Sequence, residues 1–346
     1  MATTFAVPDG RVAMAATLYT GTGNTTQVVS NAVNAVSFQP DFVWVKGRST
    51  AYSHHLTDSV RGVSKDLSSN TANAENNYAP YGTSAFNSNG FSVNDNATGD
   101  YGCNGSGTTF VGWNWKAGGT AVSNTAGTIT SSVSANTTAG FSVVTFTSTG
   151  VNATVGHGLG VTPSLILVKS RGIVLSWLVY HASVGNTKYL VLNTTAAEVV
   201  DSTVWNNTSP TANVFTVGTA FGSNTYVAYC WAPVAGYSAF GSYTGNGSTD
   251  GPFIYTGFRP RFILVKRTDS TSDWRIWDTS RTPYNAMSSI LYPNGSDAEL
   301  TATSQDFDAL SNGFKVRNSS ASMNASAGTY IYAAFAENPL RYSNAR

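Results

Sequence analysis

The sequence predicts an all-β fold made of three tandem β-sandwich repeats of a jelly-roll-like kind. Short runs of β-branched and aromatic residues recur at domain-sized intervals, and no stretch of twelve residues shows a helical period. Turn pairs such as Asn89-Gly90, Asn246-Gly247 and Asn312-Gly313 lie between the runs and favour tight hairpins. The segments 70–77 and 294–302 could each form one helical turn. Strands joined by such turns are typical of two sheets packed face to face.

One pattern occurs three times along the chain, and this repetition defines the domain organisation. In each copy a proline precedes four apolar residues, and a lysine follows six positions after the proline. The proline and lysine pairs are Pro40 and Lys46, Pro163 and Lys169, and Pro260 and Lys266. We therefore expect an N-terminal arm of residues 1–14 and three repeats at 15–119, 120–235 and 236–346, because repeats of this length are the size of domains.

The apolar runs that end at the three lysines predict buried strands. A proline lacks the backbone N–H that a sheet uses, so it suits the first residue of such a strand. Each copy ends with an aromatic strand that closes at Trp115, Trp231 or Phe335. We expect these three side chains to be buried and to face the second sheet of their own sandwich.

An Asp-x-x-Arg element follows the lysine strand in two copies, as Asp58 with Arg61 and as Asp278 with Arg281. The aspartate can cap a turn, and the arginine can pair with it or with the glutamate of the same copy, Glu75 or Glu299. The second copy has lost both members, since His181 and Val184 stand in their places. Loss of both together favours a structural pair over a ligand site.

The charge content excludes several classes of protein. The chain has 346 residues, of which 19 are basic and 18 acidic, so charged residues make up 11% of it, against about 25% in an ordinary soluble domain. A nucleic-acid-binding protein needs a basic patch, and a membrane span needs about 18 consecutive apolar residues; the sequence offers neither. Small neutral side chains are abundant, and they suit a surface that packs against other chains.

The residues that could carry chemistry do not form a recognisable catalytic, cofactor or metal motif. We expect His54 and His55 to lie on the surface or a strand exterior, and His157 to lie in a loop. Cys103 and Cys230 are expected to be free, packed thiols, as in a protein made in a reducing compartment.

Two acidic segments stay open to a chemical role. A carboxylate pair such as Asp269 and Asp273 could serve a glycosidase. The segment Asn94-Asp95-Asn96 could bind calcium, although a hairpin turn is the favoured interpretation. The N-terminal segment has no basic start followed by an apolar core, so we expect no secretory signal.

Several segments together resemble a known domain. The stretches FQPDFVWVKGRS, HHLTDSVRG and TTFVGWNWKAGG near the N-terminus, and TGFRPRFILVKRTDS and GTYIYAAFAENP near the C-terminus, resemble a domain that recurs in virion proteins of tailed phages, particularly marine and cyanobacterial phages. The resemblance extends from about residue 15 to the end of the chain. It implies a structural component of the phage particle, made in the bacterial cytoplasm, and not an enzyme.

The resemblance implies partners as well as a location. They are other virion proteins, further copies of the chain (most simply in a trimer) and a glycan of the host surface. The leading hypothesis is a tail-fibre-like or tail-appendage protein. The alternative is a capsid decoration or head-fibre protein, and a third hypothesis is a tailspike-type glycan hydrolase. The apolar residues of the arm, including Phe5, Val7 and Met14, predict either attachment to the virion or an added strand in the first repeat.

Overall fold

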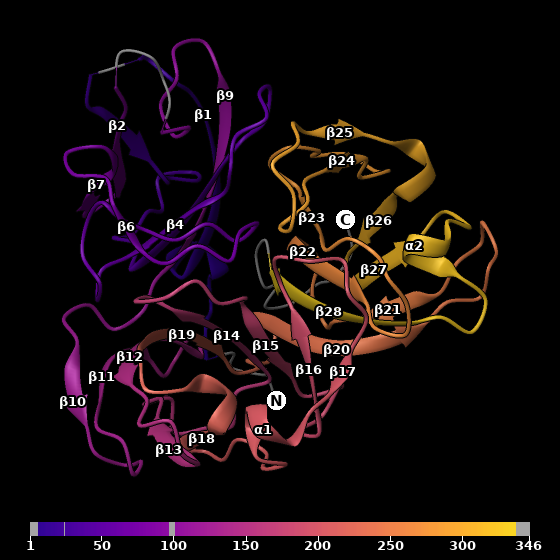
Figure 1. The fold of residues 1–346 in the computed structure, drawn as a ribbon. Coiled ribbons are helices and arrows are strands. Elements are labelled where there is room, and N and C mark those ends of the chain that lie inside the picture. The colour runs from indigo at the N-terminus through magenta and orange to yellow at the C-terminus, as the bar shows by residue number, and fades with distance from the viewer. Residues whose placement is uncertain (1–5, 24, 97–100, 337–346) are drawn as a thin grey trace.

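The computed structural model describes residues 6–23, 25–96 and 101–336, and strands dominate it. Successive thirds of the chain form three lobes, which run from indigo through magenta and orange to yellow in Figure 1. The strand pairings between named strands are all antiparallel within these described residues, and each lobe contains a large and a small sheet. The prediction of an all-β sandwich fold is therefore confirmed. We call the lobes segments 1, 2 and 3, using the predicted ranges 15–119, 120–235 and 236–346.

Each segment contains a large sheet with the same strand order. The orders are β1-β9-β3-β4, β12-β19-β14-β15 and β20-β28-β22-β23. The bounds are β1 Met14–Thr20, β9 Thr109–Trp115, β3 Phe42–Gly47 and β4 His55–Asp58; β12 Phe141–Thr147, β19 Thr225–Trp231, β14 Leu165–Ser170 and β15 Leu178–His181; and β20 Ser238–Thr244, β28 Thr329–Ala336, β22 Pro260–Arg267 and β23 Arg275–Asp278. The second sheet is extended by β10 Val122–Asn124, β11 Ser131–Asn136, β16 Lys188–Val191 and β17 Val199–Val200.

A smaller sheet accompanies each large one. In segment 1 it is β2 Gln27–Ser30, β8 Gly90–Asn94 and β7 Gly82–Asn87; in segment 2 it is β13 Ala153–Gly156 and β18 Val214–Val217; in segment 3 it is β21 Phe253–Tyr255, β27 Gly313–Val316 and β26 Phe307–Leu310. Two short ladders complete the set, β5 Lys65–Asp66 with β6 Asn76–Asn77 and β24 Ser289–Ile290 with β25 Leu300–Thr301.

Helices are brief in the described residues. They are η1 Gly10–Val12, α1 Ser202–Trp205, η2 Thr219–Phe221, η3 Thr303–Gln305 and α2 Ala321–Asn324. The helical turns expected at 70–77 and 294–302 are absent there, because both segments form loops that lead into the strands β6 and β25. The predicted boundaries fall between sheets, since β9 ends at Trp115, β10 begins at Val122, β19 ends at Trp231 and β20 begins at Ser238.

The central strands of the large sheets are buried on both faces. In β3, Val43 and Val45 point to the small sheet of segment 1, where they pack with Phe91 of β8. Phe42 and Trp44 of the same strand point the other way, into a second cluster that includes residues of all three segments. Successive side chains of a strand alternate between faces. A strand covered on both sides is therefore apolar at every position, which explains the unbroken apolar runs in the sequence.

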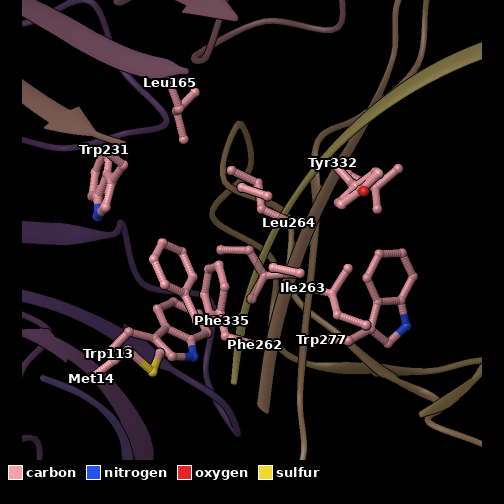
Figure 2. Close-up of a cluster of buried hydrophobic side chains, with 14 of the residues drawn as sticks. Met14, Trp113, Leu165, Trp231, Phe262, Ile263, Leu264, Trp277, Tyr332 and Phe335 are labelled. Atoms are coloured by element: carbon pink, nitrogen blue, oxygen red, sulfur yellow. The ribbon is translucent and has the colours of Figure 1, made fainter. Parts of the chain in front are cut away.

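The closing aromatic residues face one another and not the small sheets of their own segments. The ring centroids of Trp115 and Trp231 lie 5.9 Å apart, and those of Trp115 and Phe335 lie 5.6 Å apart. All three side chains are buried. Figure 2 shows Trp113, Trp231 and Phe335 together in this cluster, each from a different large sheet. The predicted orientation was therefore wrong, because the sequence does not show that the far face of each large sheet is covered by its two counterparts.

The prolines before the apolar runs take two kinds of position. Pro260 is the first residue of β22, as predicted. Pro40 and Pro163 instead lie two residues before the strands that begin at Phe42 and Leu165. In those two segments Asp41 and Ser164 come between, and each backbone N–H donates to the carbonyl of the closing aromatic residue, Trp115 or Trp231.

The N-terminal arm packs on its own chain over the residues that are described. Val7 and Met14 are buried in the cluster that includes residues of all three segments. Met14 is the first residue of β1 and pairs with Trp115 of β9. The side chain of Asp9 caps η1 and binds Arg11. Phe5 lies outside the described residues. The apolar side chains of the arm suggested attachment to the virion. The chain itself covers two of them, Val7 and Met14, whereas Val12 is 41% exposed.

Candidate functional site: the interfaces between segments

The three repeated lysines connect neighbouring segments. Lys46, Lys169 and Lys266 are buried at the ends of their apolar strands. Each Nζ donates to a backbone carbonyl of another segment: Lys46 to Ser296 at 3.0 Å, Lys169 to Ala72 at 3.0 Å and Lys266 to Thr195 at 3.1 Å. The three acceptors occupy equivalent positions, two residues after Asn294, Asn70 and Asn193. Segment 1 therefore binds segment 3, segment 3 binds segment 2 and segment 2 binds segment 1, which closes a ring.

Burial changes the acidity of these lysines. It lowers the pKa of Lys46, Lys169 and Lys266 to about 8 in each case. Each ammonium also donates to carbonyls of its own segment, for example Lys169 to Leu175 at 2.6 Å and Lys266 to Ser272 at 2.7 Å. A charged amine surrounded by carbonyl oxygens keeps its hydrogen bonds inside the protein, which offsets part of the cost of removing it from water.

The two Asp-x-x-Arg elements form buried ion pairs in corresponding places. The side chains of Asp58 and Arg61 are fully buried, as are those of Asp278 and Arg281, and the second pair is joined at 2.6 Å. One carboxylate oxygen of Asp58 accepts the backbone N–H of Arg61 at 2.8 Å, so the aspartate also caps the turn after β4. The other oxygen accepts the arginine side chain.

A residue of the closing strand in another segment completes each pair. The Tyr229 hydroxyl of segment 2 donates to Asp58 at 2.8 Å, and the Trp113 indole of segment 1 donates to Asp278 at 2.9 Å. Although burial opposes ionisation, the charge of Arg281 and its hydrogen bonds, with that of Trp113, lower the pKa of Asp278. Tyr229 and Trp113 occupy the same position of the repeated closing strand, three residues after Tyr226 and Phe110 respectively.

A glutamate joins two arginines at the rim of the same two interfaces. Glu75 accepts from Arg61 at 3.1 Å and from Arg171 of segment 2 at 2.8 Å. Glu299 accepts from Arg281 at 3.1 Å and from Arg48 of segment 1 at 2.9 Å. Burial opposes ionisation of both carboxyls, but the arginines lower the pKa of each glutamate.

The sequence pattern did not identify Arg48 and Arg171 as members of these groups. Both stand two residues after a repeated lysine, and the corresponding residue of the third copy is Thr268. The arginine is therefore missing from segment 3, which meets segment 2, and segment 2 is the copy that lacks the Asp-x-x-Arg pair. The joint loss of this arginine in one copy and of the Asp-x-x-Arg pair in another was the signal in the sequence that could have identified Arg48 and Arg171.

The interface between segments 2 and 3 uses neutral groups in place of the ion pair. His181 occupies the aspartate position, and its Nε2 donates to the carbonyl of Tyr332 at 3.2 Å. Burial lowers the pKa of His181 to about 4. The closing strand of segment 3 has Ala333 where the others have Tyr229 and Trp113. An aspartate at position 181 would lack the two side-chain donors that Asp58 has, because Val184 and Ala333 stand in their places. An imidazole can instead donate to the backbone.

One backbone contact is common to all three interfaces. The backbone N–H of each repeated glutamate donates to a backbone carbonyl of the neighbouring segment. Glu75 donates to the carbonyl of Arg171 at 3.0 Å, Glu299 to that of Arg48 at 2.7 Å, and Glu198 to that of Thr268 at 2.8 Å. At the third interface the Glu198 carboxylate binds Lys188 of its own segment. The backbone contact thus survives the loss of the arginines.

The surface prediction for His54 and His55 needs correction. His54 and His55 are buried and not on the surface. His54 Nδ1 accepts from the Trp44 indole at 2.8 Å, and its Nε2 donates to the carbonyl of Tyr292 in segment 3 at 2.9 Å. The Nδ1 atom of His55 lies 3.1 Å from the Oδ2 atom of Asp66. His54 directly precedes β4, which begins at His55, and the surrounding residues cover both side chains. His157 follows β13 in a loop and is also buried, 3.1 Å from the carbonyl of Thr211.

The acidic residues considered for catalysis or metal binding have other partners. Asp269 pairs with Arg267, and Asp273 accepts from Asn294 at 2.8 Å. The buried carboxylate of Asp95 accepts backbone N–H groups of Asn96, Tyr101, Cys103 and Asn104. These donors suit an anion and not a calcium ion. Within residues 6–23, 25–96 and 101–336, no group of three or more His, Cys, Asp or Glu side chains could hold a metal ion.

The two cysteines are free and lie in different clusters. Cys103 packs between the two sheets of segment 1, and Cys230 packs in the core of segment 2. Among the helices of the described chain, none is long and apolar enough to cross a membrane.

Comparison with known proteins gives one match. The model of a family described as a domain of unknown function, DUF7483, matches residues 12–339. Searches of curated proteins and of solved structures found no match. The matched range begins before β1 and ends after β28, so it contains all three large sheets and every interface described above. The chain therefore belongs to the DUF7483 family.

Proposed function

We propose that this chain is a structural protein of a bacteriophage virion, of the tail-fibre-like or tail-appendage type, that contacts the surface of the host cell. The observation that carries the proposal is the closed ring of interfaces between the segments. Buried lysines, ion pairs and aromatic residues join the three segments into one body. A component of an extracellular particle needs such resistance to opening, because it must persist without repair.

The distribution of charge supports a role in assembly. Thirteen residues with formally charged side chains, counting only Asp, Glu, Lys and Arg, are buried within the described part of the chain, out of 37 in the full sequence (19 basic and 18 acidic). The outer surface is correspondingly poor in charge. Small hydroxyl and amide groups lose little side-chain entropy when another chain covers them, and removing them from water costs less than removing charged groups. The proposed partners are therefore other virion proteins and further copies of this chain, with a trimer as the expected assembly.

Locating the protein on purified particles tests the proposal. Virions of the encoding phage would be labelled with an antibody against this chain and viewed by negative-stain microscopy, and the number of copies per particle would be measured by quantitative mass spectrometry. We expect label on the tail and a small copy number in multiples of three. Label over the head with hundreds of copies would support the capsid decoration alternative. Absence from purified virions would overturn the proposal.

A further inference from the structure

One surface loop of segment 3 is longer than its counterparts. Between Arg281 and β24 it has seven residues, 282–288, whereas three residues, 62–64, separate Arg61 from β5, and three, 185–187, separate Val184 from β16. The flanking elements correspond in the three segments, so the four additional residues form an insertion on a common framework. Binding residues often lie on such loops, because the rigid framework positions them.

The long loop is held on both sides. The Asn285 side chain donates to the carbonyl of Ala309 at 3.1 Å and accepts the N–H of Ala309 at 2.9 Å. On the other side, Arg259 donates to the carbonyl of Pro283 at 3.4 Å. Tyr284 lies between these two attachments and is 83% exposed. Its ring is thus presented to solvent by a loop that is already ordered, which reduces the entropy that a ligand must remove on binding.

A pocket of about 670 Å³ opens beside Tyr284. Its walls are the long loop, Arg259 and the tip of the β26–β27 hairpin, which adds Ser311 and Asn312. This volume lies in the range of small-ligand sites, roughly 300–1,000 Å³. The lining residues include no carboxylate and one cationic side chain, which already donates to Pro283. The wall combines an aromatic face with hydroxyl and amide groups.

The neighbouring edge strand carries two further exposed aromatic side chains. In β21, Phe253 and Tyr255 are exposed, and Tyr255 pairs with Gly313, the residue after Asn312. The pairing of the small sheets places Val28 and Ser30 at the corresponding positions of segment 1, and Thr154 and Gly156 at those of segment 2. The exposed aromatic pair and the long loop are therefore both specific to segment 3.

We propose that this pocket of segment 3 binds a neutral saccharide. The Tyr284 ring stacks on the apolar face of a pyranose, while Ser311 and Asn312 exchange hydrogen bonds with its hydroxyl groups. A sugar presents an apolar ring face and a polar edge, which matches this combination of groups. A polyanion such as nucleic acid needs several cationic side chains, and a lipid needs an apolar cavity. This inference rests on the proposed function for its biological role, since it locates the surface that meets a host glycan.

Saturation-transfer NMR with purified full-length protein tests the inference. The probes are four neutral oligosaccharides: maltohexaose, cellohexaose, mannohexaose and chitohexaose. We expect millimolar binding of at least one of them, with transfer strongest at its ring protons. Tyr284→Ala should weaken that binding by about tenfold or more, whereas Tyr284→Phe, which retains the ring, should bind nearly as well as the native protein. Val200→Ala, at a residue 73% exposed in segment 2, is the matched control and should change nothing.

The outcomes separate this inference from the proposed function. No binding to any of the four probes, or binding that Tyr284→Ala leaves unchanged, overturns the saccharide site. If the protein is found on tails but does not bind sugar, the site fails and the structural role stands. If the purified protein binds sugar through Tyr284 but is absent from virions, the structural role fails and the site stands.

Discussion

The hydroxyl of Tyr229 donates a hydrogen bond of 2.8 Å to the carboxylate of Asp58, although the two residues are 171 positions apart in the sequence. Trp113 and Asp278 form the corresponding contact across 165 positions. Each contact connects the closing strand of one segment to the Asp-x-x-Arg turn of another. The Asp-x-x-Arg element is therefore not complete within its own copy, because it depends on an aromatic donor that another copy supplies.

Removing the Tyr229 hydroxyl should destabilise the protein. In Tyr229→Phe, the buried carboxylate of Asp58 loses one donor and the Arg61 guanidinium loses an acceptor at 3.0 Å. We expect the free energy of unfolding in urea to fall by about 1–3 kcal/mol. Tyr284→Phe is the control, because its ring is largely exposed and its unfolding should not change. Equal stability of the two variants would show that the hydroxyl contributes nothing at the interface.

Truncating a closing aromatic residue should destabilise more than its own segment. Trp231 packs against Phe42, Trp115 and Phe141, and so contacts segment 1 as well as its own. Trp231→Ala should lower the free energy of unfolding by roughly 3–5 kcal/mol, since it leaves a cavity in a packed core. Calorimetry should show a lower unfolding temperature in a single transition. An unchanged temperature would contradict the central position of this side chain.

The buried lysines should contribute stability that increases as the pH rises from about 8 to 10. The folded lysines at positions 46, 169 and 266 have a pKa of about 8, below the value of about 10.5 in the unfolded chain. In that window the unfolded chain binds protons that the folded protein lacks, so raising the pH favours the folded state. Buried thiols and tyrosines oppose this trend in the same range. Burial raises the pKa of Cys103, Cys230, Tyr229, Tyr237 and Tyr243, so these groups ionise first in the unfolded chain.

Lys169→Met provides the control for this pH dependence. Burial alone lowers the pKa of Lys169, so its contribution is the simplest of the three. We expect the unfolding free energy of the native protein minus that of the variant, measured by urea titration at several pH values, to increase between pH 8 and 10. If the native protein and Lys169→Met change their stability in parallel over that range, the lowered pKa of Lys169 is contradicted.

Stability should fall with acid between about pH 6.5 and 4. His181 has a folded pKa of about 4, and the unfolded side chain titrates near 6.5. In this window the unfolded chain binds a proton that folded His181 does not, so lowering the pH favours unfolding. Burial also lowers the pKa of His54 and His157, which act in the same direction. His181→Gln retains an N–H donor but cannot titrate, and its thermal stability should depend less on pH over this range. An identical acid profile would argue against a neutral His181.

The local pattern was sufficient to predict the strands. Apolar runs such as that ending at Lys46, turn pairs such as Asn312-Gly313 and the aromatic strand ending at Trp231 all lie where the sequence places them. Strand formation depends on neighbouring residues and on the alternation of side chains, and both can be read along the chain. The pairing of Asp58 with Arg61 was also predictable, because it spans only three residues.

The partners across segments could not be read in that way. Alternation shows that Trp115 and Phe110 lie on opposite faces of β9, but it does not show what covers each face. Here the small sheet covers one face and the two other segments cover the other. The same reason explains why His54 is buried, and why Lys46 finds its acceptor in Ser296. These contacts join residues hundreds of positions apart, so they arise when the three large sheets pack, and no local propensity encodes them.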